Sequence, residues 1–132
     1  MIHGIGIDIF EVARLERLLE SEGDQYLPQL FTPDEIEYGN RQRHSREFFG
    51  RFFAAKEAVI KAIASPELAG FYWREIEIRP DANGCHSVHF MGVVRELVEK
   101  LRIHSIHIFI QATDRIAIAV AVACGSNEQG AR

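Results

Sequence analysis

Two charged residues, Glu57 and Lys61, lie four residues apart in residues 48–62, a stretch rich in alanine. Alanine favours a helix, and the four-residue spacing places both side chains on the same side of it. Such a pair is most often a surface ion pair, but it can also point a carboxylate and an ammonium group into a site. The periodicity alone does not choose between these interpretations.

A second carboxylate, Asp8, interrupts the apolar alternation of Ile5, Ile7 and Ile9. An acidic residue inside an apolar strand is unusual. Asp8 could cap the helix that follows, or it could be a carboxylate held rigidly beside a site. We favour the second interpretation, because rigid elements position catalytic groups well.

Positive charge is gathered in two places. One is the run Arg41-Gln42-Arg43-His44-Ser45-Arg46, and the other is the pair Arg14 and Arg17. A solvated basic turn and a solvated helix face are the ordinary interpretations. The run could also hold an anion, and the pair could dock an acidic partner.

The composition limits the class of protein. The chain has 132 residues, of which 47% are hydrophobic, and a formal net charge of −4. These values predict one folded domain, over residues 1–124 with a flexible tail at 125–132, and argue against general nucleic-acid binding. Cys85 and Cys124 match no metal-binding spacing. We expect neither a membrane span nor a secretory signal, and hence a cytoplasmic protein.

The elements that must position these residues follow from hydrophobic periodicity. Thr32, Pro33 and Glu35 form a strong helix start with a capping box. Helices and antiparallel pairs in succession favour an α+β domain. The expected strands are 5–9, 74–79, 86–90, 106–111 and 116–123, and the expected helices are 11–20, 33–39, 48–64 and 93–101.

The sequence resembles a known family, the holo-acyl-carrier-protein synthases, which are the short form of the 4′-phosphopantetheinyl transferases. The resemblance covers almost the whole chain and implies that family's fold, an antiparallel sheet packed with a long central helix and shorter helices. Three blocks carry it in order. They are Gly4-Ile5-Gly6-Ile7-Asp8-Ile9 with Glu11 and Arg14, Phe31-Thr32 with Glu35-Ile36-Glu37-Tyr38, and Gly50-Arg51-Phe52-Phe53-Ala54-Ala55-Lys56-Glu57-Ala58 with Lys61-Ala62.

The resemblance implies a reaction. The family transfers 4′-phosphopantetheine from coenzyme A to a serine of acyl carrier protein and releases 3′,5′-ADP. Splitting a pyrophosphate requires a hard cation, Mg²⁺ or Mn²⁺, and the resemblance assigns Asp8 and Glu57 as its ligands. Lys61 would stabilise the pyrophosphate. Either Glu57 or a metal-bound water could accept the serine proton.

The resemblance also implies roles for the basic residues. Arg51 and the neighbouring Arg43, His44 and Arg46 would hold the 3′-phosphate of coenzyme A. Lys56 could face the carrier protein or solvent. Carrier proteins are acidic, and Arg14 and Arg17 would dock them. The family forms homotrimers with active sites at the subunit interfaces, and it serves carrier proteins of fatty acid synthesis and other pathways.

The sequence departs from the family in one strand. Where the family has a Ser-x-Ser-His-Thr-like run near the nucleotide, this chain has Phe109-Ile110-Gln111-Ala112-Thr113. The family histidine is thus replaced by Ala112, and the upstream His107 is expected to be a partly buried, satisfied side chain. Two hypotheses follow. The chain is either an active transferase with an altered coenzyme A pocket, or a non-catalytic protein of the same fold that acts as a carrier-protein-binding or assembly protein.

Overall fold

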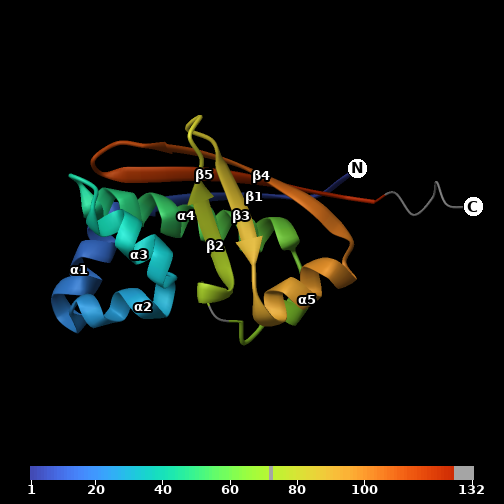
Figure 1. The fold of residues 1–132 in the computed structure, drawn as a ribbon, viewed down its shortest axis with the longest axis horizontal. Coiled ribbons are helices and arrows are strands. Elements are labelled where there is room, and N and C mark those ends of the chain that lie inside the picture. The colour runs from blue at the N-terminus through green and yellow to red at the C-terminus, as the bar shows by residue number, and fades with distance from the viewer. Residues whose placement is uncertain (72, 127–132) are drawn as a thin grey trace, which may run out of the picture.

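The computed structural model describes residues 1–71 and 73–126, and confirms an α+β architecture. Figure 1 shows its helices and antiparallel strands. The strands are β1 (Ile2–Glu11), β2 (Ile76–Pro80), β3 (His86–Phe90), β4 (Ile103–Ala112) and β5 (Ile116–Gly125). The helices are α1 (Val12–Glu22), α2 (Leu27–Leu30), α3 (Pro33–Asn40), α4 (Ser45–Ile63) and α5 (Gly92–Lys100), with 3₁₀ turns η1 (Asp24–Tyr26), η2 (Pro66–Leu68) and η3 (Trp73–Glu75).

The larger sheet has the strand order β1-β5-β4, and both of its ladders are antiparallel. The N-terminal strand therefore pairs with the last strand of the chain, with Asp8 opposite Ala119. Strands β2 and β3 form a separate two-stranded hairpin. None of the helices in residues 1–71 and 73–126 is long and apolar enough to cross a membrane.

The two faces of the larger sheet have opposite characters. The inward face carries the alanines of β5, which are buried against α4. The outward face carries the isoleucines of β1, and Ile7 and Ile9 are 56% and 65% exposed. Phe109 of β4, whose register partner is Val120, is 61% exposed on the same face. This monomer therefore leaves a broad apolar sheet face in solvent, which is uncommon for a chain that works alone.

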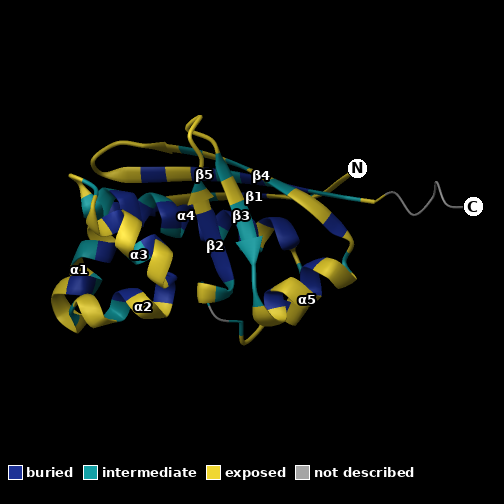
Figure 2. Cartoon of the chain, in the orientation of Figure 1, coloured by how far each residue is buried: buried dark blue, intermediate teal, exposed yellow. Residues whose placement is uncertain are grey.

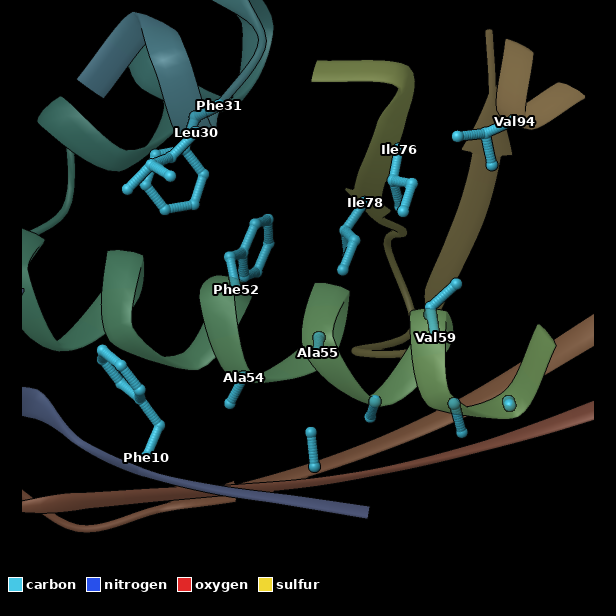
Figure 3. Packing of buried hydrophobic residues seen from close by; sticks show 14 of the residues in the cluster. Phe10, Leu30, Phe31, Phe52, Ala54, Ala55, Val59, Ile76, Ile78 and Val94 are labelled. Atoms are coloured by element: carbon cyan, nitrogen blue, oxygen red, sulfur yellow. The ribbon is translucent and has the colours of Figure 1, made fainter. Parts of the chain in front are cut away.

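Helix α4 lies between the larger sheet and the layer formed by β2 and α2 (Figure 3). Its small residues allow a close approach to the sheet. A Cβ atom added at Gly6 would lie 1.9 Å from the Ala58 carbonyl oxygen, and one added at Gly4 would lie 2.2 Å from that of Ala62. On its other side, Phe52 packs toward β2 and α2 (Figure 3). Figure 2 shows that α4 is largely buried, whereas α1 and α3 expose their outer faces.

The sequence places most elements correctly but not their ends. Helix α4 begins at Ser45, so Arg46 belongs to its first turn rather than to the preceding loop. The short α2 was not expected, and β4 begins at Ile103 rather than 106. Strand β5 reaches Gly125, one residue beyond the expected domain end, and the remainder of the expected tail at 127–132 lies outside the described residues.

Lys56 does not face solvent or a partner. Its side chain is 0% exposed, and its Nζ atom lies 2.6 Å from Glu35 Oε1. Glu35 completes the predicted capping box of α3, in which Thr32 Oγ1 accepts a hydrogen bond from the Glu35 N–H. Lys56 can be buried in the core because the buried Glu35 carboxylate compensates its charge.

Candidate active site

Asp8 lies on the inward face of β1, between Gly6 and Phe10, and therefore faces α4. Glu57 and Lys61 approach it from α4, one helical turn apart. The close packing of Gly6 on Ala58 brings β1 and α4 near enough for these side chains to meet. The three residues predicted from the sequence to form the catalytic and metal-binding group are therefore together in space.

Lys61 pairs with Asp8 and not with Glu57. Its Nζ atom lies 3.2 Å from Asp8 Oδ1 and donates a hydrogen bond to the Ile7 carbonyl oxygen at 3.0 Å. The other carboxylate oxygen, Asp8 Oδ2, is buried and has no hydrogen-bond partner among the described residues. Buried polar atoms are usually satisfied, so this oxygen is available to a ligand.

The surroundings of Glu57 disfavour the charged form of its carboxyl group. Burial raises the pKa of its carboxyl, and the negative charge of Asp8 raises it further. Lys61 and Arg14 lower that pKa. The two carboxylates are therefore close enough to repel each other, and the neighbouring cations offset only part of the cost.

The donor set fits a hard cation that is held by few protein ligands. In residues 1–71 and 73–126 there is no group of three or more His, Cys, Asp or Glu residues placed to hold a metal. Two repelling carboxylates, one with an unsatisfied buried oxygen, are compatible with Mg²⁺, which commonly keeps several waters and binds one or two carboxylates together with substrate phosphates.

Arg51 faces a different pocket, on another side of α4. This cavity of about 180 Å³ is lined by Arg51 with Tyr38, Phe48, His86 and Ile110, among others. Burial lowers the pKa of His86, and the charge of Arg51 lowers it further, whereas Asp81 raises it. Arg51 has no hydrogen bond or ion pair with another described residue, so an aromatic-walled pocket holds a cation that an anionic ligand could engage.

The other predicted phosphate-binding residues are less uniform. Arg43 and His44 are exposed. Arg46 is half-buried, and its Nη1 atom is buried without a hydrogen-bond partner in the described part of the chain. Of the three, Arg46 alone has a buried nitrogen that an anionic ligand could engage.

The carboxylate group and the Arg51 pocket do not merge within one chain. Arg51 and Glu57 are six positions apart on α4, which on an α-helix corresponds to about 120° around the axis and about 9 Å along it.

The two arginines of α1 lie near the carboxylates. Arg14 lies near Glu57 and over the Phe10 ring, 5.5 Å from its centroid, and Arg17 is exposed one turn later on α1. The predicted docking pair thus lies on the carboxylate side of the molecule.

The comparison with known proteins identifies the family. Residues 4–121 match the model of the 4′-phosphopantetheinyl transferase superfamily. The chain belongs to this superfamily. It is 37% identical over 123 residues to the holo-[acyl-carrier-protein] synthase of Caldicellulosiruptor saccharolyticus, covering 93% of this chain and 97% of that protein. It is 33% identical over 122 residues to that of Koribacter versatilis, covering 92% and 98%.

Solved structures of the same kind have the same fold. The holo-[acyl-carrier-protein] synthase of Neisseria meningitidis superposes with a TM-score of 0.86 at 27% identity, covering 94% of this chain and 99% of that one. A Bacillus anthracis synthase in complex with CoA (3′,5′-ADP) gives a TM-score of 0.76 at 29% identity, covering 96% and 99%. The resemblance found in the sequence is therefore confirmed.

In this phosphopantetheinyl transferase fold, the residues of β4 that differ from the family pattern lie on both faces of the sheet. Phe109 and Gln111 pair with Val120 and Ile118 and lie on the outward face of the sheet, away from α4. Ala112, opposite the buried Ala117, lies on the inward side two residues after Ile110 of the Arg51 pocket. Only one of the three replacements therefore faces the inner layer. His107 is exposed, contrary to the expectation of a partly buried side chain, because its register partner Val122 is on the outward face.

Two groups of residues at the site were missed from the sequence. His86 sits at the start of a short strand, and nothing in its neighbours marks it as a pocket residue. Trp73 and Tyr26 line a cavity with Phe10 and Arg14, although they come from 3₁₀ turns without a periodic pattern. Hydrophobic periodicity and short motifs do not link turns that are so far apart in the chain.

Proposed function

We propose that this chain transfers 4′-phosphopantetheine from coenzyme A to a serine of apo-acyl carrier protein and releases 3′,5′-ADP. The observation that carries this proposal is the convergence of Asp8, Glu57 and Lys61 from β1 and α4. The relatives that share the fold are named holo-[acyl-carrier-protein] synthases, and a structural neighbour is described in complex with CoA (3′,5′-ADP).

The reaction transfers a phosphoryl-linked group between two oxygens. The serine Oγ attacks the phosphorus that bears the pantetheine arm, and the bond from that phosphorus to the bridging oxygen breaks. 3′,5′-ADP leaves with that oxygen, and the serine proton passes to Glu57 or to a water beside it. Catalysis of this kind consists mainly of positioning and neutralising charge.

Asp8 and Glu57 would hold a divalent cation, Mg²⁺ or Mn²⁺. When bound, such a cation neutralises the charge that accumulates on the pyrophosphate. Lys61 would then stabilise the same oxygens from the other side, since its ammonium is already fixed by Asp8 and the Ile7 carbonyl. Arg14 adds positive charge beside Glu57.

The arginine pocket would receive the nucleotide end of coenzyme A. Arg51 is a half-buried cation without a hydrogen-bond or ion-pair partner in the described chain, and aromatic side chains surround it. Arg46 offers a buried, unbonded nitrogen, and the exposed Arg43 and His44 add positive character. These four residues are proposed as ligands of the nucleotide phosphates, the 3′-phosphate above all.

We further propose a homotrimer with sites at the subunit interfaces. The exposed apolar face of β1, β5 and β4 favours burial against another copy. The separation of the carboxylates from the Arg51 pocket in one chain also favours a site completed by two copies. Sedimentation that gives a monomer at working concentrations would contradict this assembly.

One assay tests the function. Purified protein, Mg²⁺, coenzyme A and an apo-acyl carrier protein are mixed, and the carrier protein is weighed by mass spectrometry. We expect the mass of phosphopantetheine to be added, and the variants Asp8→Ala and Glu57→Ala to abolish the gain. A carrier protein that binds but never gains mass would favour the alternative, a catalytically impaired carrier-binding or assembly protein, for which the replacement at Ala112 is the specific argument.

A further inference from the structure

The imidazole of His86 forms part of the wall of the Arg51 pocket. His86 is the first residue of β3, and its register partner across the hairpin, Pro80, lines the same cavity of about 180 Å³. The His86 ring meets the Phe52 ring edge-on, with centroids 5.8 Å apart. His86 is half-buried, and neither ring nitrogen has a hydrogen-bond partner in the described part of the chain. Packing therefore positions the ring, while its polar atoms remain available to a ligand.

The charges around His86 favour an anion in this cavity. Arg51 of α4 faces the same cavity, and its positive charge opposes protonation of the imidazole. Asp81 is the other charged group that acts on His86, with the opposite effect. The Asp81 Oδ1 atom already accepts hydrogen bonds from the Asn83 and Cys85 N–H groups, both at 2.9 Å, and thereby holds the turn. An anion between Arg51 and His86 would remove a repulsion that Asp81 offsets only in part.

The other walls of the pocket supply no further positive charge. Apart from Arg51 and His86, the lining side chains are aromatic, aliphatic or, at Gln42, an amide that donates a hydrogen bond to the Tyr38 carbonyl oxygen. Strand β4 contributes Ile110, and Ala112 follows it on the same face, so this strand brings no polar side chain to the wall. Arg51 and His86 are therefore the lining side chains that can carry a positive charge.

Under the proposed function, one group of the donor matches this pair. The pyrophosphate of coenzyme A lies where the reaction occurs, beside Asp8 and Glu57. The 3′-phosphate is instead a terminal phosphate, with a charge of about −1.5 to −2 near pH 7 and three acceptor oxygens. It can therefore accept charge-assisted hydrogen bonds from a guanidinium and an imidazolium at the same time.

We propose that His86 binds the 3′-phosphate of the donor together with Arg51, so that a residue of the β2–β3 hairpin sets the preference of this chain for a 3′-phosphorylated nucleotide. This inference rests on the proposed function. It also answers the specific argument for an impaired enzyme: although β4 has Ala112 where the resemblance led us to expect a histidine, an imidazole reaches the nucleotide pocket from another element.

Two nucleotides that differ only in this phosphate test the assignment. Calorimetry measures the dissociation constants of 3′,5′-ADP and of 5′-AMP, which lacks the 3′-phosphate. His86→Ala should weaken the binding of 3′,5′-ADP about tenfold and leave that of 5′-AMP nearly unchanged. Equal weakening of both nucleotides, or of neither, would overturn the proposal, because His86 would then contact the base or the ribose, or no ligand.

His89→Ala is the matched control. His89 lies on the same strand but on the opposite face of the hairpin, where its ring is hydrogen-bonded to Ser87 at 2.9 Å. The variant removes an imidazole from β3 without touching the pocket, so both dissociation constants should stay near the wild-type values. If His89→Ala weakened 3′,5′-ADP as much as His86→Ala does, the effect would come from the charge or the stability of the hairpin, and the proposal would be wrong.

NMR titration of the His86 imidazole in the wild-type protein gives a test that does not depend on whether a variant folds. Bound 3′,5′-ADP should raise the pKa of His86 by about one unit, because an adjacent dianion favours the protonated ring, and 5′-AMP should leave that pKa nearly unchanged. The affinity of the wild type for 3′,5′-ADP, relative to that of His86→Ala, should therefore fall as the pH rises through the free and bound pKa values. An unchanged pKa of His86 with 3′,5′-ADP bound would overturn the proposal.

The two proposals fail in different ways. If the wild-type protein binds neither coenzyme A nor 3′,5′-ADP and no carrier protein gains mass, the proposed function is wrong and this inference falls with it. If the carrier protein gains mass normally but His86→Ala does not change the preference for 3′,5′-ADP over 5′-AMP, the inference about His86 alone is wrong.

Discussion

The Lys61 ammonium lies 3.2 Å from Asp8 Oδ1, although Glu57 precedes it by one turn on the same helix. An isolated helix would favour the i,i+4 pair. Here β1 offers Lys61 both a carboxylate and the Ile7 carbonyl oxygen, so the ammonium is drawn across to the strand. Glu57 is left beside Asp8 with incomplete compensation, which raises its pKa.

The first prediction is that Glu57→Gln abolishes transfer and yet stabilises the fold. The ordinary pKa of glutamate is 4.5, and the pKa of Glu57 in the folded protein is higher. The folded state therefore holds its proton more tightly than the unfolded state, and wild-type stability falls, relative to the variant, as the pH rises through this window. At pH 7 the variant should melt about 3 °C higher, with the difference vanishing below pH 4.5.

Magnesium provides the matching control for this prediction. If Asp8 and Glu57 hold the cation, Mg²⁺ should raise the melting temperature of the wild type and have little effect on Glu57→Gln. Thermal denaturation with and without Mg²⁺ at pH 7 measures both effects. An equal Mg²⁺ response in the two proteins would show that Glu57 is not a ligand.

The second prediction concerns the contact that brings the carboxylates together. In Gly6→Ala the new Cβ atom would lie 1.9 Å from the Ala58 carbonyl oxygen and 2.7 Å from the Ala62 nitrogen, both of which are backbone atoms. Strand β1 must then move away from α4, which should cost about 3 kcal/mol or more and separate Asp8 from Lys61. Chemical denaturation measures the loss of stability, and the mass-spectrometric assay measures the loss of transfer.

Gly84→Ala is the matched glycine control. Gly84 has a φ of +79° in the exposed turn between β2 and β3, and no atom lies within 4 Å of its added Cβ. Only backbone strain is expected, roughly 1 kcal/mol. If the two variants lost similar stability, the close approach of β1 to α4 would not be the constraint inferred here.

Local patterns predicted the parts of this site that lie on one element. The four-residue spacing predicted that Glu57 and Lys61 share one face of a helix. Asp8 stood out as a site residue because it interrupts the apolar alternation of β1. The capping box at Thr32 and Glu35 formed as expected, but only the fold brings Lys56 to Glu35, because 21 residues of chain separate them. The sequence therefore suggested a solvent or partner contact for a lysine that is wholly buried.

The outward face of the sheet shows the same limit. Alternation in β1 and the continuous apolar run in β5 correctly predicted strands, yet the larger isoleucines face outward and the alanines face α4. Size explains this: a helix can lie close to a sheet only over small side chains, so glycine and alanine occupy the inner face. Periodicity alone separates two faces of a strand but does not say which one the helix covers.

The third prediction concerns the binding of the nucleotide end of coenzyme A by Arg51. Arg51→Ala should raise both the KM for coenzyme A and the inhibition constant of 3′,5′-ADP, by about tenfold each, because both ligands carry the nucleotide phosphates. It should also raise the pKa of His86, since the Arg51 charge now lowers it, and NMR titration of the imidazole measures this change without catalysis. Arg95→Ala on α5 is the control. An unchanged inhibition constant for 3′,5′-ADP would contradict the assignment of Arg51.

The last prediction concerns the docking surface on α1. Arg17 is exposed, one turn from Arg14. Arg14 also lies near Glu57 and lines a cavity with Tyr26 and Trp73. Arg17→Glu therefore isolates docking, and it should raise the KM for carrier protein about tenfold at low salt with kcat nearly unchanged. The difference should shrink as salt screens the charges. Arg95→Glu makes the same charge change on α5 and should leave that KM near the wild-type value. If Arg14→Glu and Arg17→Glu both left the KM unchanged at low salt, the acidic partner would have to dock elsewhere.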